Sequence, residues 1–243
     1  MECYGCTKTT MKLLRDSTSP KLILANEHAL AHYINGAQMS ESNLIQSLID
    51  QLDSADPFTS NLLSKRLLEY GSAAVPQLIE ALLYTRLPRS WRAANILAQI
   101  DDPRWFVPMV MAVRAENPLL GHAAVNALAE RYPKQAIAPL VAALPSCHSI
   151  VQLRIIAVME ELHATESVLQ LIELLALTDS ATMRAALLQA LGTLGDKSLI
   201  NIAQQYLDDP DPHVRRHARK CVAKLDAPHV DLNLLNAASS QSA

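Results

Sequence analysis

The sequence predicts an all-α solenoid, a superhelix of antiparallel helix pairs that stack one on the next. The first observation is a repeat. Arg154, Arg184 and Arg215 recur in one apolar context at steps of 30 and 31 residues, and steps of 32 and 30 back from Arg154 reach His122 and Arg92. A fixed period of this size is typical of repeat proteins. The second observation is composition: 50% hydrophobic residues with only six glycines and two phenylalanines favour helices.

One repeat, read from residue 178 to 207, predicts a helix, a short turn and a second helix. Apolar residues follow Ser180 at helical spacing, and a turn from Gly192 to Asp196 separates them from a second apolar stripe that ends at Leu207. Each helix has one apolar face that it cannot bury alone, so the units must stack. The same frame predicts five complete units and a final half unit. Their ranges are 59–85, 88–115, 118–144, 149–177, 180–208 and 211–226.

Prolines support this frame, because three of them recur at steps of 32 and 31 residues, at Pro76, Pro108 and Pro139. Proline is tolerated in the first turn of a helix, so each is predicted to open the second helix of its unit.

The ends of the chain differ from the array. Residues 1–38 are predicted to be a partly disordered extension, 39–58 a capping helix, 59–226 the repeat array and 227–243 a C-terminal tail that is disordered from residue 236 onward. Met39 is followed by residues that can cap a helix, so either Met1 or Met39 can be the natural start.

Two segments resemble a known repeat family. Residues 209–218, Asp-Pro-Asp-Pro-His-Val-Arg-Arg-His-Ala, resemble the HEAT-repeat consensus, and residues 191–196, Leu-Gly-Thr-Leu-Gly-Asp, resemble its variety named after the phycobilisome lyases. The resemblance covers about residues 59–226, with departures at His122 and at the 162–165 turn. It implies a HEAT-like fold of about five and a half repeats. Because the family includes adaptors, bilin lyases and a phycobilisome-degradation factor, it also implies protein binding, with a phycobiliprotein as one partner.

Charge and hydropathy exclude several classes of function. A net charge of −3 and a pI near 6.2 disfavour nucleic-acid binding. The longest apolar stretch has about eight residues, whereas a membrane span needs roughly 20. No signal-peptide pattern follows Met1. The sequence therefore predicts a soluble cytoplasmic protein without nucleic-acid or membrane partners.

No constellation predicts a catalytic residue, a metal site or a cofactor. Cys3, Cys6, His28 and His32 have zinc-ligand residue types, but the central spacing of 21 residues exceeds the 12–15 expected of a zinc finger. Zinc therefore remains the alternative to free thiols and surface histidines.

Four apolar residues near the first turn of the array are candidates for binding. Trp91 and Trp105 bracket that turn, and Met109 or Met111 would face a partner if the second helices line the concave surface of the solenoid. The alternative is that they pack between the units.

Charged residues offer two further candidates. The arginine ladder is formed by Arg92, Arg154, Arg184 and Arg215. It is predicted to be structural, pairing with acidic residues and carbonyls of neighbouring units rather than binding an anion. Residues 215–220 form a basic run, interpreted as the solvated face of a capping helix or, alternatively, as a contact for an acidic partner.

The leading functional hypothesis is a non-enzymatic scaffold that binds another protein through its concave face. The alternative is a bilin lyase or lyase-like chaperone, which could hold pigment on a thiol such as Cys147 or Cys221, although nothing in the sequence activates either residue. A HEAT-like nucleic-acid enzyme is disfavoured by the charge.

Overall fold

The computed structural model describes residues 40–53 and 56–227. The chain divides into two compact units, residues 1–47 and 48–243, and the boundary falls within helix α3 (Glu41–Gln51). The predicted extension 1–38 and nearly all of the predicted tail 227–243 lie outside the described residues. Helix α3 falls inside the segment 39–58 that was predicted to cap the array.

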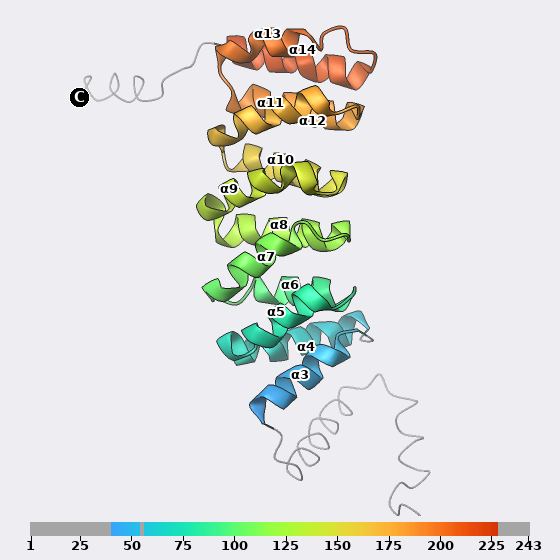
Figure 1. Cartoon of the computed structure of the whole chain (residues 1–243), viewed down its shortest axis with the longest axis vertical. Helices are drawn as coiled ribbons and strands as arrows, with labels where there is room; N and C mark the ends of the chain where they lie inside the picture. The colour runs from blue at the N-terminus through green and yellow to red at the C-terminus, as the bar shows by residue number, and fades with distance from the viewer. Residues whose placement is uncertain (1–39, 54–55, 228–243) are drawn as a thin grey trace, which may run out of the picture. The chain divides into compact units, whose positions relative to one another are not determined.

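The second unit is a row of helix pairs, and its described residues contain no strand (Figure 1). The first helices of the pairs, with the unpaired last helix, are α4 (Pro57–Tyr70), α6 (Arg89–Leu97), α8 (Pro118–Arg131), α10 (Ser149–Glu161), α12 (Ala181–Leu194) and α14 (Pro212–Asp226). The second helices are α5 (Val75–Tyr84), α7 (Phe106–Ala112), α9 (Pro133–Ala143), α11 (Val168–Leu177) and α13 (Ile200–Gln204). The predicted all-α solenoid of antiparallel helix pairs is therefore confirmed.

Consecutive first helices pack closely against one another, more closely than most consecutive second helices do. Small residues permit this approach. A Cβ atom added at Gly192 of α12 would lie 3.0 Å from the Cα of Cys221 on α14. One added at Gly121 of α8 would lie 2.8 Å from both the carbonyl oxygen of Val113 and a methyl carbon of Val151 on α10. The first helices thus form a tightly spaced row.

Polar side chains fix where the first helices begin. Asp56 accepts hydrogen bonds from the backbone N–H groups of Phe58 and Thr59 at the start of α4, and Asn117 accepts one from Leu119 at the start of α8. Asp211 does the same for α14. Each cap pairs backbone donors that have no partner within the helix.

The proline prediction is correct for two units and wrong for the third. Pro76 lies in the first turn of α5 and Pro108 in that of α7. Pro139 lies inside α9, which begins at Pro133. Pro133 has the fixed φ that favours a first helical position, so the helix starts well before the proline that matches the repeat.

Within the described ranges, no helix is long and apolar enough to cross a membrane.

Candidate binding surface on the first helices

The first-helix face is the surface that α4, α6, α8, α10, α12 and α14 present away from the second helices. Pockets lie on this face between consecutive first helices, at α4–α6, α6–α8 and α12–α14. The sequence prediction had instead placed the binding surface on the second helices. The difference follows from packing, because the first helices form the closely spaced row.

The pocket between α6 and α8 has a volume of about 440 Å³. From α6 it is lined by Trp91 and Asn95, which lie four residues apart and therefore share one side of the helix, and Gln99 lines it from the turn that follows α6. From α8 it is lined by His122, Asn126 and Glu130, which have the same spacing of four residues. Alanines complete the lining of the pocket. The pocket therefore combines amide groups, which both donate and accept hydrogen bonds, with one indole and one imidazole ring.

Trp91 also lines the pocket between α4 and α6, which has a volume of about 370 Å³. Asn95 likewise lines both pockets. On the α4 side, the α4–α6 pocket is lined by Ser60, Asn61 and Ser64. The Trp91 residue is 42% exposed. A large ring between two pockets presents apolar area to whatever enters either of them, and buries further area when a partner binds.

A hydrogen-bonded network links the α6–α8 pocket to α10. The Arg154 Nε donates to the Oδ1 of Asn126, and the Nδ2 of Asn126 lies 3.2 Å from the Nδ1 of His122. Because Oδ1 of Asn126 accepts from arginine, its amide nitrogen is the atom that faces the imidazole ring of His122.

Arg154 is itself held by a carboxylate. Its Nη1 and Nη2 donate to the two Oε atoms of Glu161 at 2.7 and 3.2 Å. The hydrogen bond from Arg154 lowers the pKa of Glu161 despite partial burial. The pair fixes the guanidinium, and the guanidinium fixes Asn126, so the polar wall of the pocket is preorganised.

The structure separates the four predicted binding residues. Trp105 and Met109 are fully buried, at 0% exposure each, so they pack inside the unit and cannot contact a partner on its surface. Trp105 donates from Nε1 to the carbonyl of Ile100 at 2.9 Å and stacks edge-to-face on Tyr132. Trp91 on α6 and Met111 on α7, which is 59% exposed, stay candidates but lie on different helix rows.

The arginine ladder does not keep one helix position throughout. Arg92, Arg154 and Arg184 each stand one residue before a buried residue. Those buried residues are Ala93, Ile155 and Ala185. Arg215 is followed by the exposed Arg216 and stands three residues before the buried Ala218.

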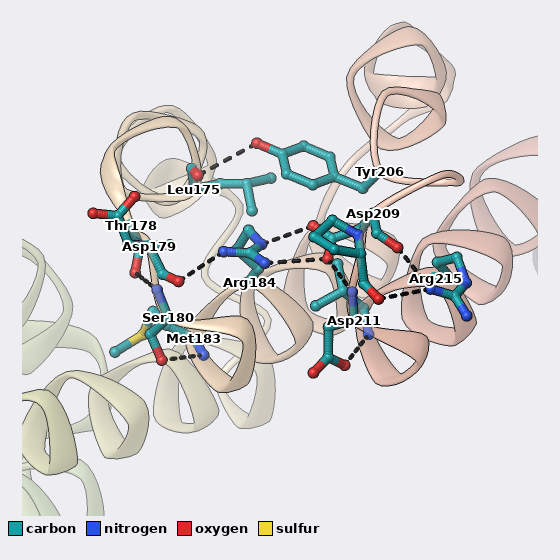
Figure 2. Close-up of polar contacts among 12 residues, drawn as sticks. Leu175, Thr178, Asp179, Ser180, Met183, Arg184, Tyr206, Asp209, Asp211 and Arg215 are labelled. Carbon is teal, nitrogen blue, oxygen red and sulfur yellow. Dashed lines mark hydrogen bonds and ion pairs between the residues drawn. The ribbon is translucent and has the colours of Figure 1, made fainter.

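Arg184 and Arg215 both bind the turn that precedes α14 (Figure 2). Arg184 forms a bidentate pair with Asp209, with Nε 2.9 Å from Oδ2 and Nη2 3.1 Å from Oδ1. Arg215 donates from Nη1 to the carbonyls of Asp209 and Pro210. Burial by itself would raise the pKa of Asp209, but the hydrogen bonds from Arg184 and from the backbone N–H of Asp211 lower it.

Arg92 donates to the backbone carbonyl of Leu52. Together with the contacts of Arg154, this gives every arginine of the ladder a carbonyl, amide or carboxylate acceptor. These contacts are of the structural kind that the sequence suggested.

The two described thiols are not activated. Burial raises the pKa of Cys147, and it raises that of Cys221 to about 11, in each case against a smaller opposing effect of a nearby cation. A thiol reacts as the thiolate, so a raised pKa and burial both slow attack. Cys3 and Cys6, with His28 and His32, lie outside the described residues. Within the described residues, no group of three or more His, Cys, Asp or Glu side chains could hold a metal ion.

We expect Cys221 to stay unlabelled by iodoacetamide in the folded protein at pH about 8, where an ordinary thiol with a pKa near 8.5 is partly ionised. Labelling should appear on unfolding in urea. Peptide mapping by mass spectrometry distinguishes Cys221 from the other cysteines. Labelling of Cys221 in the native state as fast as in urea would contradict the buried, protonated thiol.

Comparison with known proteins matches part of the chain to a repeat family. Residues 168–242 match the family described as HEAT repeats. No curated protein matches the chain significantly. Among solved structures, the chain is similar to an engineered protein at 20% identity, covering 75% of this chain and 96% of that one with a TM-score of 0.46. It is similar to a designed armadillo repeat protein at 17% identity, covering 75% and 100% with a TM-score of 0.43. It is also similar to human deoxyhypusine hydroxylase in complex with glycerol, at 18% identity, covering 87% and 92% with a TM-score of 0.43.

The family match is to HEAT repeats in general, so the narrower phycobilisome-lyase variety stays a prediction.

Sequence reasoning found Trp91 but missed the pocket around it. A signal was present: buried Ala93 on α6 corresponds to buried Ala124 on α8, a step of 31 residues. At that step Trp91 corresponds to His122, not to an arginine, and Asn95 corresponds to Asn126. Aligning the helices by their expected core residues instead of by the arginines would have placed both pairs on one face.

Proposed function

We propose that this protein is a non-enzymatic scaffold that binds another protein through its first-helix face. The observation that carries the proposal is the pair of adjoining pockets around Trp91, whose walls combine an exposed indole with amide side chains. Tryptophan is enriched among the residues that contribute most to protein–protein affinity. Asparagine and glutamine can both donate to and accept from a polypeptide backbone.

The arrangement suits recognition better than chemistry. The Arg154–Glu161 pair holds Asn126 in place, so a partner pays little entropy to order that wall of the pocket. Glu130 is the single charged side chain that lines the α6–α8 pocket. A surface of this composition favours a polypeptide over a nucleic acid, which would need a cationic groove.

For the partner we propose a phycobiliprotein subunit, on the strength of the sequence resemblance to the phycobilisome-lyase repeat variety. The lyase alternative is less well supported. A thiol that carries bilin would have to form a thiolate, and both described thiols have a raised pKa.

Site-specific photo-crosslinking tests the scaffold. A benzophenone amino acid is placed at Gln99, which is exposed in the α6–α8 pocket, or at Leu169, which is exposed on α11. We expect a defined protein adduct from native extract at Gln99, its loss on Trp91→Ala, and none at Leu169. Equal adducts at both positions would contradict a first-helix binding face.

The same reagents test the identity of the partner. Purified phycobiliprotein subunits, with and without bilin, replace the extract. We expect the Gln99 adduct with either form, because a scaffold recognises the polypeptide. An adduct that requires bilin would instead favour handling of the pigment, and an adduct with neither form would exclude these subunits as the partner.

A further inference from the structure

The first-helix face changes character at α14. On α6 and α8 its outward positions carry Trp91, Asn95 and Asn126, whereas α14 presents five basic or imidazole side chains. These residues form the α14 basic stripe: His213, Arg216, His217, Lys220 and Lys224. Their spacings of three and four residues place them on one side of the helix.

The stripe borders a pocket between α12 and α14 with a volume of about 420 Å³. From α12 the pocket is lined by Ala181, Thr182, Ala185, Ala186 and Gln189. His213 and His217 line it from α14, and Asp211 lines it from the preceding turn. Three alanines give the α12 side of the pocket a short apolar wall, and the two histidines of the stripe face it from α14.

The cations of the stripe are largely uncompensated. Neither Arg216 nor Lys220 forms an ion pair with a described residue. Lys224, at the far end of the stripe, donates to the hydroxyl of Thr193, which in turn donates to the carboxylate of Glu160. Asp211 is the one carboxylate at the pocket, and it accepts hydrogen bonds from the backbone N–H groups of His213 and Val214 as the helix cap. Among neighbouring arginines, Arg184 is neutralised by Asp209.

We propose that the α14 basic stripe and its pocket bind an acidic polypeptide segment that carries an apolar side chain, the segment's carboxylates meeting the stripe and its apolar side chain entering the pocket. This inference rests on the proposed scaffold function and names the chemistry of the partner at one end of the first-helix face. Charge complementarity selects an acidic occupant. The three alanines on the α12 side of the pocket favour a polypeptide over a nucleic-acid backbone, which has no apolar side chain to place against them.

The histidines agree with this assignment. Burial lowers the pKa of His217, and the positive charges of Lys220, Arg216 and His213 lower it further. Carboxylates bound at the stripe would offset that repulsion and favour protonation of His217. Binding should therefore take up a proton and strengthen as the pH falls below about 6.5, the ordinary histidine pKa, while glutamates of the ligand stay ionised.

Fluorescence anisotropy with synthetic probes tests the proposal. The probes are a glutamate-rich peptide with one central leucine, the same peptide with glycine in its place, and an oligothymidylate of equal charge. We expect the leucine peptide to bind best. The double substitution Arg216→Glu with Lys220→Glu should weaken binding at least about tenfold.

A matched control separates local contact from net charge. Lys134→Glu with Lys197→Glu changes the charge equally, at exposed cations outside α14. This control should weaken binding by less than about threefold, because distant exposed charges are screened by salt. Ala186→Leu should fill the pocket and remove the advantage of the leucine peptide, while circular dichroism confirms the helical fold of each variant.

Equal weakening by both double variants, absence of peptide binding, or tighter binding of oligothymidylate would each overturn the proposal. The outcome is distinguishable from the crosslinking result. If the stripe variants leave the adduct at Gln99 unchanged, the proposal of an acidic segment is refuted, whereas the proposed scaffold function stands. Peptide binding at the stripe without a Gln99 adduct would refute the scaffold face around Trp91.

Discussion

Asp209→Ala is expected to destabilise the second unit by about 3–5 kcal/mol, because it leaves the guanidinium of Arg184 without its carboxylate in a largely buried site. The two side chains are 6% and 14% exposed. Asp209 also accepts from the backbone N–H of Asp211, so the substitution loosens the turn that starts α14 (Figure 2). Urea denaturation followed by circular dichroism measures the change.

The neighbouring residue gives the control. Asp208 is exposed and carries the same charge, so Asp208→Ala should change the stability by no more than about 0.5 kcal/mol. Replacing both partners, Arg184→Met with Asp209→Leu, should recover most of the loss, because it removes the unpaired charge together with its partner. Equal effects of the two alanine substitutions would show that the pair contributes nothing.

The Asp209 pair should also show a defined pH dependence. The pKa of Asp209 is lowered on folding, so its contribution is present above the unfolded value of about 3.9 and is lost as the pH falls through the lower folded value. The stability difference between the native protein and Asp209→Asn should therefore shrink on acidification below about pH 4. A difference that grows in acid would contradict the lowered pKa.

The sequence was sufficient to predict the helix pairs because local patterns determine them. The apolar spacing after Ser180 reappears as α12. The turn predicted from Gly192 was placed too early, because the helix continues to Leu194 and ends at Gly195. The arginines were less reliable guides. Arg92, Arg154 and Arg184 each precede a buried residue whereas Arg215 precedes an exposed one, and a periodic count of arginines cannot detect that difference. The packing between helices determines which residue an arginine side chain contacts. The spacing of residues within one helix does not specify that packing.

The same limit explains the binding prediction. Met109 and Met111 are two residues apart on α7, so one is buried while the other is exposed. The sequence alone did not show which row of helices would be closely spaced. It therefore did not show which face of the array would carry the pockets. That depends on small residues such as Gly121 and Gly192 meeting their counterparts on the next helix.

The two tryptophans provide the most direct test of this assignment. Trp105→Ala should cost about 3–5 kcal/mol, because it removes a fully buried ring and leaves a cavity. It also removes the donor that pairs with the Ile100 carbonyl and the edge-to-face contact with Tyr132, whose centroid lies 5.1 Å away. The carbonyl left unsatisfied in the interior adds to the loss.

Trp91→Ala should cost no more than about 1.5 kcal/mol, because its residue is already 42% exposed and the ring gives up only partial burial. It should nevertheless abolish the adduct at Gln99, whereas Trp105→Phe, which keeps most of the buried ring, should retain both the fold and the adduct. Thermal unfolding and crosslinking together check the contrast. If Trp91→Ala lowers the stability as much as Trp105→Ala, Trp91 is a core residue, and loss of the adduct would report unfolding instead of a lost contact. If Trp91→Ala leaves the adduct intact, the ring between the two pockets is not the anchor of the binding face.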